Sequence, residues 1–94
     1  MAIRSFRHAG LARFFRTGAK AGIRPEHAAR LRRVLAVLDA ASGSHDVGLP
    51  GFALHPLKGK DAGRWAITIS GNWRVTFAVS KAKEMVDVDY EDYH

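Results

Sequence analysis

Two alternating runs, separated by a glycine and an asparagine, are the strongest constraint on how this chain can fold. In residues 65–70 and 73–79, large apolar side chains occupy every second position. A period of two is typical of half-buried β-strands, and Gly71-Asn72 between them predicts a hairpin. A two-residue turn would set Ile69 directly opposite Arg74. We therefore expect a three-residue connection from Gly71 to Trp73, or an equivalent bulge.

The expected register determines where Arg74 lies. The predicted pairs are Ser70 with Arg74, Thr68 with Thr76, and Ile69 with Val75. On this register Arg74 projects from the polar face of the hairpin, beside hydroxyl groups, and not into the core.

The remaining chain supplies two helices and three further strands. The predicted strands are Ala2–Arg7, Phe52–Leu57 and Met85–Tyr90, and the predicted helices are His8–Thr17 and Pro25–Ala41. The last strand is expected to place Val86, Val88 and Tyr90 on one side. The order β-α-α-β-β-β-β predicts an α+β fold, with the two N-terminal helices packed on one face of a mainly antiparallel sheet.

Length and composition exclude several classes of protein. Ninety-four residues fit one domain, predicted to span residues 1–94. The absence of cysteine excludes disulfides and thiolate metal sites. The N-terminus lacks the apolar core of a signal peptide, and no apolar run is long enough for a membrane span. We expect a cytoplasmic protein with no membrane partner.

The charge is strongly asymmetric along the chain. The formal net charge is +6, and residues 1–33 contain nine basic residues and one acid, Glu26, whereas residues 84–92 contain five acids and no base. A basic surface attracts polyanions because phosphate contacts release condensed counterions. Two interpretations remain open: a solvated helix surface facing water, or a surface that binds nucleic acid or an acidic protein.

Three residues have the chemistry that RNA cleavage without a metal requires. The reaction needs cations that stabilise the phosphorane and groups that transfer protons. Arg74 can hold two phosphate oxygens, and Lys58, in the Gly-rich loop 58–64, offers a compact charge. His94 is flanked by acids that favour its protonated form, which suits a general acid. Our central hypothesis is that the fold brings Lys58, Arg74 and His94 together.

Each of these assignments has a simpler alternative. A terminal histidine is often a frayed surface residue, and the same holds for Asp92 and Tyr93. Tyr93 could stack on a base, donate a hydrogen bond or only anchor the tail. His55 precedes a proline at a strand end, where a structural histidine is common. A metal site of His94, Asp92 and Asp89 matches no specific spacing, so no metal or other cofactor is predicted.

The strings LHPLKG, GRWAITISGNWRVTF and DVDYEDYH, together with the opening SFRHAGLARFF, resemble the HigB branch of the RelE/ParE toxin superfamily over the whole length. The resemblance implies a RelE-like fold and a toxin of a type II toxin-antitoxin system. Such toxins are metal-independent endoribonucleases (mRNA interferases) that cleave messenger RNA in the ribosomal A site. The implied partners are the ribosome and a HigA-type helix-turn-helix antitoxin, with operator DNA bound only through that antitoxin.

Position by position, the resemblance implies a catalytic set and an RNA-binding set. The catalytic set is Lys58, Arg74, Asp92, Tyr93 and His94, of which Lys58 and Arg74 hold the phosphate and His94 transfers protons. The RNA-binding set is His55, Lys60, Arg64 and Ser70. Some family members carry arginine at the position of Ser70, so this chain lacks one cation there and could recruit Lys60 or Arg64 instead.

Two other functions compete with the nuclease. The superfamily also contains toxins that act on DNA gyrase, so a non-catalytic inhibitor or binding module is one alternative. A co-repressor that acts with its antitoxin on their promoter is another, and it is compatible with the nuclease.

Overall fold

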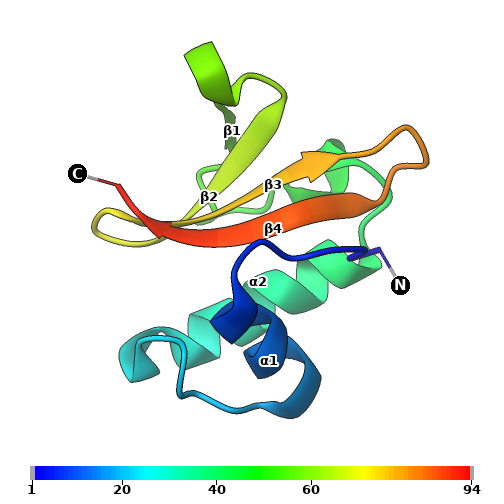
Figure 1. Cartoon of the computed structure of the whole chain (residues 1–94). Coiled ribbons are helices and arrows are strands. Elements are labelled where there is room, and N and C mark those ends of the chain that lie inside the picture. The colour runs from blue at the N-terminus through cyan, green and yellow to red at the C-terminus, as the bar shows by residue number, and fades with distance from the viewer. Residues whose placement is uncertain (1, 94) are drawn as a thin grey trace.

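The structure, a computed structural model, describes residues 2–93 of the chain. The helices are α1 (Ala9–Thr17) and α2 (Ala28–Ala40), and the strands are β1 (His55–Pro56), β2 (Arg64–Ser70), β3 (Trp73–Val79) and β4 (Met85–Asp92). The strands form one antiparallel sheet in the order β1-β2-β3-β4. Both helices lie on the same side of that sheet (Figure 1). The predicted α+β class is confirmed.

α1 begins and ends where flanking residues satisfy its free backbone groups. The Nδ1 atom of His8 accepts a hydrogen bond of 2.9 Å from the Leu11 N–H. Gly18 follows the helix with φ of +79°, and its N–H donates to the Phe14 carbonyl at 2.8 Å. Glycine adopts this left-handed conformation without steric cost. The predicted helix and its stop at Gly18 are confirmed.

α2 packs an apolar stripe against the sheet. Pro25 starts a 3₁₀ turn that leads into the helix, at a position where a missing N–H leaves no hydrogen bond unmade. The buried stripe consists of Ala28, Leu31, Val34, Leu35 and Leu38. These residues form one hydrophobic cluster with strand residues such as Val75, Phe77 and Val88. Within residues 2–93, no helix is long and apolar enough to cross a membrane.

The β2–β3 hairpin has a different register from the predicted one. The observed pairs are Ser70–Trp73, Thr68–Arg74, Ile67–Val75 and Ala66–Thr76. The turn is the two-residue Gly71-Asn72, because Gly71 adopts a positive φ of +55° without strain. The irregularity lies at Ile69, which stays buried without facing Arg74. The predicted pairs are therefore wrong by two residues on β2, although the expected bulge is present.

β4 contains a second bulge that the sequence pattern does not reveal. The pairs on either side of it are Ala78–Val86 and Thr76–Asp89. Asp87, between them, has a positive φ of +52°. The extra residue reverses the alternation, so Met85 and Val88 are both buried, whereas Val86 lies on the other face. The prediction that Val86 shares a face with Val88 is wrong for this reason.

Of the predicted strands, Ala2–Arg7 does not form and Phe52–Leu57 is shorter than expected. Segment 2–7 makes only isolated parallel bridges to β4, which are Ile3–Met85 and Phe6–Val88. Segment 52–57 is reduced to β1, because Ala53 has a φ of +50° and Pro56 has no N–H to donate to a ladder. Phe52 is buried in the core instead.

Two glycines allow α1 to lie against the loop that precedes α2. A β-carbon on Gly22 would be 2.5 Å from the Cα of Gly10, and one on Gly10 would be 2.6 Å from the Gly22 carbonyl oxygen. These are backbone atoms, which cannot rotate away as a side chain can. The close approach explains why a glycine occurs in the first turn of α1, where it otherwise lowers helix stability.

We predict that Gly22→Ala lowers the free energy of unfolding by about 1–3 kcal/mol, because backbone must move to admit the methyl group. Gly48→Ala is the matched control, since its φ is −77° and the nearest atoms would lie 3.9 Å from the new carbon. The control is expected to stay within about 1 kcal/mol of the unmodified protein. Urea unfolding of both variants measures the difference, and equal stabilities would contradict the close contact.

Candidate active site

The sheet face turned away from the helices carries the polar groups of the candidate site. Val75 and Phe77 face the helices, so Arg74 and Thr76 lie on the opposite side of β3. We call this side the outer face, and it is formed by Arg64, Thr68, Arg74, Thr76 and Glu91. Thr68 and Glu91 lie on either side of Arg74 in the neighbouring strands.

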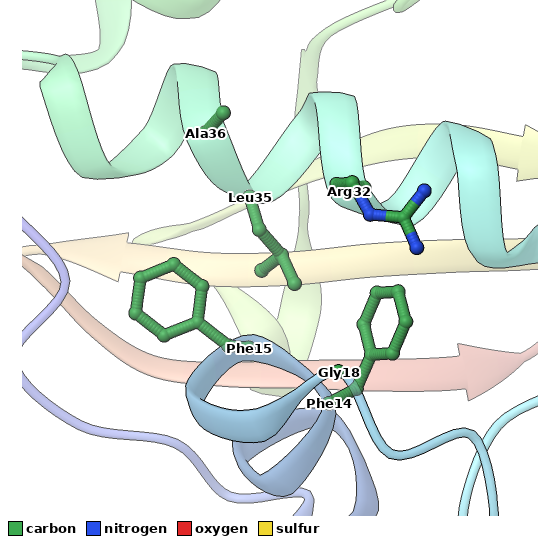
Figure 2. A pocket seen from close by; sticks show the side chains of 6 residues that line it. All are labelled: Phe14, Phe15, Gly18, Arg32, Leu35 and Ala36. Carbon is green, nitrogen blue, oxygen red and sulfur yellow. The ribbon is translucent and has the colours of Figure 1, made fainter.

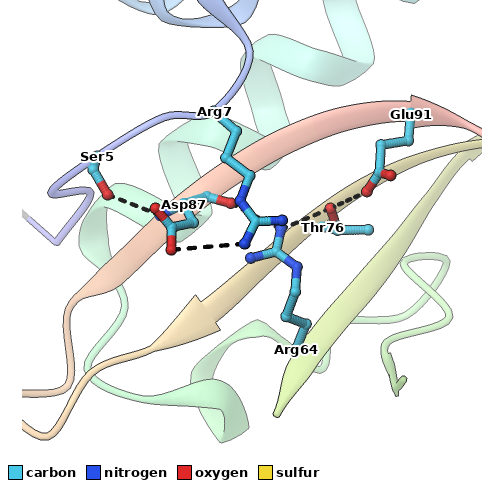
Figure 3. Close-up of polar contacts among 6 residues, drawn as sticks. All are labelled: Ser5, Arg7, Arg64, Thr76, Asp87 and Glu91. Carbon is cyan, nitrogen blue, oxygen red and sulfur yellow. Dashed lines mark hydrogen bonds and ion pairs between the residues drawn. The ribbon is translucent and has the colours of Figure 1, made fainter. Parts of the chain in front are cut away.

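A buried arginine connects three strands on the outer face (Figure 3). The Nη2 atom of Arg64 donates to the Thr76 hydroxyl at 2.9 Å and to the Asp87 carbonyl at 2.8 Å. The Thr76 hydroxyl in turn donates to Oε2 of Glu91 at 2.6 Å. Arg64 is 8% exposed and Thr76 is 0% exposed. The network fixes the bulge at Asp87 and the orientation of Glu91.

One nitrogen of this arginine has no partner. Nη1 of Arg64 is buried and forms no hydrogen bond with any residue from 2 to 93. A buried charge whose donor is unpaired is costly, and its electrostatic effect is weakly screened. Arg64 therefore adds positive potential beneath the outer face, although its guanidinium is not presented to solvent.

Tyr93 attaches the tail to the outer face. Its N–H donates to the Asn72 carbonyl at 2.8 Å, which extends the pairing of β4 with the hairpin. Burial raises the pKa of the Tyr93 phenol, and the negative charges of Glu91 and Asp61 raise this pKa further. The phenol thus remains protonated at neutral pH and can donate a hydrogen bond. The effect of Asp61 indicates that the loop after β1 lies near this ring.

That loop also contains Lys58 and Lys60. It stands on the side of the sheet away from the helices (Figure 1). Both lysines are exposed, and Lys58 immediately precedes a 3₁₀ turn at Gly59–Asp61. The loop is attached to β2 by a 2.9 Å hydrogen bond from the Leu57 N–H to the Arg64 carbonyl.

Arg74 lies at the other end of the outer face, beside the hairpin turn. Its Nη1 atom donates to the Gly71 carbonyl at 2.7 Å and to the Trp73 carbonyl at 3.0 Å. No residue in the described part of the chain accepts a hydrogen bond from its Nε or Nη2, so these donors are available to a ligand. Ser70 is exposed at the adjoining end of β2.

The two predicted phosphate-binding cations do not touch. Lys58 lies next to the residue that pairs with Arg64, whereas Arg74 pairs with Thr68. Four residues of extended β2 separate these two positions, which corresponds to about 13 Å. The outer face between them is long enough to receive a segment of nucleic acid backbone.

Of the tail residues predicted to be catalytic, Asp92 and Tyr93 lie within the described part of the chain. His94 lies outside the described residues, so its convergence with Lys58 and Arg74 stays a prediction. Asp92 pairs with Trp73 and therefore lies on the side opposite to Tyr93. Its charge acts on Arg24, whose pKa is raised mainly by a hydrogen bond to Glu26 and to a smaller extent by Asp92.

His55 is exposed at the start of β1 and has a defined tautomer when neutral. Its Nδ1 atom lies 2.9 Å from the Ala53 carbonyl oxygen. A carbonyl only accepts hydrogen bonds, so Nδ1 carries the proton and Nε2 is left as an acceptor. Among residues 2–93, no three histidine, aspartate or glutamate side chains are grouped so that they could hold a metal ion.

An aromatic cluster supports the hairpin and the tail from the helical side. Nδ1 of His27 lies 2.6 Å from the Tyr90 hydroxyl oxygen, and the rings of Tyr90 and Trp73 are 4.6 Å apart between centroids. Arg24 lies over Trp73 at 5.8 Å. Burial lowers the pKa of His27 and raises that of Tyr90. The cluster packs beneath the hairpin end of the sheet, next to Arg74 and residues 92–93.

The sequence did not lead us to place Thr76 or Glu91 in the site, although Glu91 is one of the acids expected to favour the protonated form of His94. Both lie on the outer face, and Glu91 is opposite Arg74. Their polar character within an alternating strand was a usable signal. The burial of Arg64 could not be predicted from the sequence, because an arginine at the start of a strand usually faces water.

Two comparisons with known proteins apply to this chain. A profile of the family described as "RelE-like toxin of type II toxin-antitoxin system HigB" matches residues 4–94. Endoribonuclease HigB from Proteus vulgaris is 36% identical over 92 residues, which cover 98% of this chain and 99% of that relative. The matched segment of the profile contains all the predicted site residues.

We predict that Thr76→Val lowers the free energy of unfolding by about 1–3 kcal/mol, because the buried Arg64 guanidinium and the Glu91 carboxylate both lose a partner. The shape of the side chain is retained. Thr68→Val is the control, since the Thr68 hydroxyl forms no hydrogen bond within the described chain. Urea unfolding tests this expectation, and equal losses in the two variants would show that the network is not stabilising.

We also predict that the protein loses stability at acidic pH because of His27. Because its pKa is lowered in the folded protein, the unfolded chain binds the proton more readily. Stability from this residue is complete above the unfolded pKa of about 6.5 and is lost as the pH falls below it, by at most about 1.4 kcal/mol per pH unit. Unfolding free energies measured between about pH 7 and pH 5 should show this decline.

His27→Gln removes the titrating ring and should flatten the decline, even if it lowers stability at every pH. An unchanged slope in the His27 variant would contradict the assignment.

Proposed function

This chain belongs to the HigB family of RelE-like toxins of type II toxin-antitoxin systems, and from this premise we propose that it is an endoribonuclease that cuts messenger RNA in the ribosomal A site. The observation that carries the proposal is the outer face. There, Lys58, Arg74 and the protonated phenol of Tyr93 lie on the side of the sheet away from α1 and α2. The near-full-length relative named as an endoribonuclease supports the same activity.

The proposed reaction uses the RNA's own 2′-hydroxyl as the nucleophile. The 2′-oxygen bonds to phosphorus and the bond to the 5′-oxygen breaks, which leaves a 2′,3′-cyclic phosphate and a 5′-hydroxyl. A base takes the proton from the 2′-hydroxyl, and an acid gives one to the departing 5′-oxygen. No step requires a metal ion or a cofactor.

The residues of the outer face divide these tasks. The Nε and Nη2 donors of Arg74 bind the phosphate oxygens, and Lys58 adds a second positive charge from the loop. Tyr93 donates a hydrogen bond to the same group. His94 supplies the proton to the leaving oxygen, and Asp92 supports it from the tail.

The remaining predicted residues serve RNA binding around this centre. Lys60 lies in the loop beside the outer face, and His55 offers its Nε2 atom near that loop. Ser70 is exposed at the hairpin end of the sheet, where it pairs with Trp73. Arg64 contributes indirectly, through the positive potential of its buried guanidinium and by fixing Glu91 through Thr76.

The proposed partners follow from this arrangement. The outer face holds few catalytic groups, so the ribosome is proposed to supply part of the site and to present the messenger in the required conformation. A HigA-type antitoxin neutralises the toxin in the cytoplasm and carries the complex to operator DNA. One observation favours an additional binding function. Many arginines lie in the helical part of the chain and not on the outer face.

We predict that Arg74→Ala lowers messenger RNA cleavage on programmed ribosomes by about a hundredfold or more, because charge on the phosphorane loses its donor. Removal of His94 should cause a loss of similar size by removing the acid. Primer extension on the messenger, with single-turnover rates, measures both effects. Lys81→Ala, on the exposed turn between β3 and β4, is the control and should cleave at the normal rate.

Cleavage that is unchanged in both variants would remove the proposed mechanism. If unmodified toxin makes no cuts on translating ribosomes but still arrests growth, a non-catalytic inhibitor of another target replaces the nuclease.

A further inference from the structure

The proposed reaction needs a base for the 2′-hydroxyl, and few described side chains on the outer face can accept a proton. The guanidinium of Arg74 and the ammonium group of the exposed Lys58 only donate hydrogen bonds. The phenol of Tyr93 keeps its proton, because burial raises its pKa. The remaining described groups on this face are the carboxylates of Asp89 and Glu91 in β4.

The groove between α1 and α2 does not supply a base. Its volume is about 280 Å³, and it is lined by Phe14, Phe15, Gly18, Arg32, Leu35 and Ala36 (Figure 2). Arg32 is the polar side chain of this lining, and a guanidinium does not take up a proton. The base therefore has to lie on the outer face or at its border.

Glu91 is the carboxylate placed next to the proposed phosphate site. It stands directly opposite Arg74 in the pairing of β4 with β3. Residues opposite each other on one face have β-carbons about 4.5–5.5 Å apart. A 2′-hydroxyl beside a phosphate on Arg74 is therefore within reach of Glu91. Asp89 lies one pair further along, opposite Thr76, and one of its oxygens accepts the Tyr90 N–H at 2.9 Å.

A relay of hydrogen bonds fixes one oxygen of the Glu91 carboxylate (Figure 3). The Nη2 atom of Arg64 can only donate, so the Thr76 hydroxyl accepts from it at 2.9 Å and uses its own proton for Oε2 of Glu91, at 2.6 Å. Arg64 and Thr76 are both buried, so water does not compete for these bonds. The relay has one direction, in which Glu91 is the acceptor.

The other oxygen of this carboxylate, Oε1, is open to a substrate. Within residues 2–93, it accepts no hydrogen bond, and Glu91 forms no ion pair. The opposite guanidinium, that of Arg74, uses its Nη1 atom for the Gly71 and Trp73 carbonyls. Glu91 is partly exposed. One carboxylate oxygen is thus held by the protein, and the other is available to accept a proton.

We infer that Glu91 is the general base of the proposed reaction. Its Oε1 atom takes the proton from the 2′-hydroxyl as the 2′-oxygen bonds to phosphorus, while His94 gives a proton to the departing 5′-oxygen. Water then removes the proton from Glu91 and returns one to His94. The inference rests on the proposed function, because it names the base of that reaction. Thr76 and Arg64 are positioning residues for this carboxylate.

Glu91→Gln tests the assignment, because the amide keeps an oxygen that can accept from Thr76 but is not a base. Single-turnover cleavage of messenger RNA on programmed ribosomes should fall by about a hundredfold or more. Cosedimentation with ribosomes should be unchanged, since the phosphate donors remain. Normal cleavage by this variant would overturn the inference.

Two matched variants control for the loss of one negative charge. Asp89→Asn makes the same change on the same face of β4, two residues away. Glu84→Gln makes it before β4 begins, where the carboxylate lies 3.8 Å from Arg4. Both should cleave at close to the normal rate. A loss in Asp89→Asn as large as that in Glu91→Gln would show that the negative charge of the face matters and not one base, which would contradict the assignment.

A sulfur substrate distinguishes a base from an acid. In this messenger, sulfur replaces the bridging 5′-oxygen of the scissile bond, and a thiolate leaves without protonation because a thiol is far more acidic than an alcohol. Deletion of His94 should therefore cost little with this substrate. Glu91→Gln should remain slow, because the 2′-hydroxyl still has to lose its proton. If sulfur restores the rate of Glu91→Gln, this residue serves the leaving group and is not the base.

A double-mutant cycle tests the positioning by Thr76. Thr76→Val alone should slow cleavage by about tenfold, because Oε2 of Glu91 loses its donor. In the Glu91→Gln background it should cause no further loss, since no base is left to position. Losses that multiply would show that Thr76 acts on stability alone, and the relay would be wrong. Urea unfolding shows whether each variant is folded under the assay conditions.

His55 is the competing base, because its Nε2 atom is an acceptor. It lies on β1, and β2 separates this strand from β3, so about 10 Å of sheet lies between His55 and the strand of Arg74. If His55→Gln stays slow with the sulfur substrate and Glu91→Gln does not, the base is His55 and the inference is wrong.

Comparison with Arg74→Ala separates this inference from the proposed function. If the unmodified toxin cuts, Arg74→Ala is slow and Glu91→Gln is normal, the base lies elsewhere and the nuclease proposal stands. If the unmodified toxin makes no cuts on ribosomes, the proposed function fails and this inference fails with it.

Discussion

The contact of the buried Arg64 guanidinium with Thr76 and with the Asp87 carbonyl is the constraint on which the outer face depends. A positive φ at Asp87 is unfavourable for a residue with a side chain, and the arginine compensates by binding the carbonyl that this conformation presents. The resulting bulge reverses the alternation of β4. Without it, Val88 would face away from the core, and the acidic residues of the tail would change sides.

This reversal decides which groups can act together. After the bulge, Glu91 and Tyr93 share the outer face with Arg74, while Tyr90 turns inward to meet His27 and Trp73. The same strand therefore supplies polar groups to one face and an aromatic anchor to the other. A structural arginine and the proposed chemistry are coupled in this way, although Arg64 itself is not exposed to a substrate.

The sequence was sufficient for both helices, the β2–β3 hairpin and β4, but not for segments 2–7 and 52–57 or for the exact pairing of the strands. Periodicity identified both helices and the strands of the hairpin, because burial of one face leaves a direct trace in residue order. The register of β2 was wrong, since two positions of the bulge preserve the same apolar pattern. The bulge at Asp87 could not be predicted from the sequence. Val86, Val88 and Tyr90 occupy every second position, as they would in a strand without a bulge. The site residues followed from resemblance, and the burial of Arg64 depends on contacts between distant strands that no local pattern encodes.

The pairing of segment 2–7 with β4 has a consequence for synthesis of the protein. Ile3 and Phe6 pair with Met85 and Val88, so segment 2–7 can take its place only after β4 has been synthesised. Such non-local contacts form only after the intervening chain is available. Until β4 is available, the sheet and its outer face are incomplete. The bulge at Asp87 is among these late contacts, because the Asp87 N–H donates a hydrogen bond of 2.8 Å to the Ser5 hydroxyl.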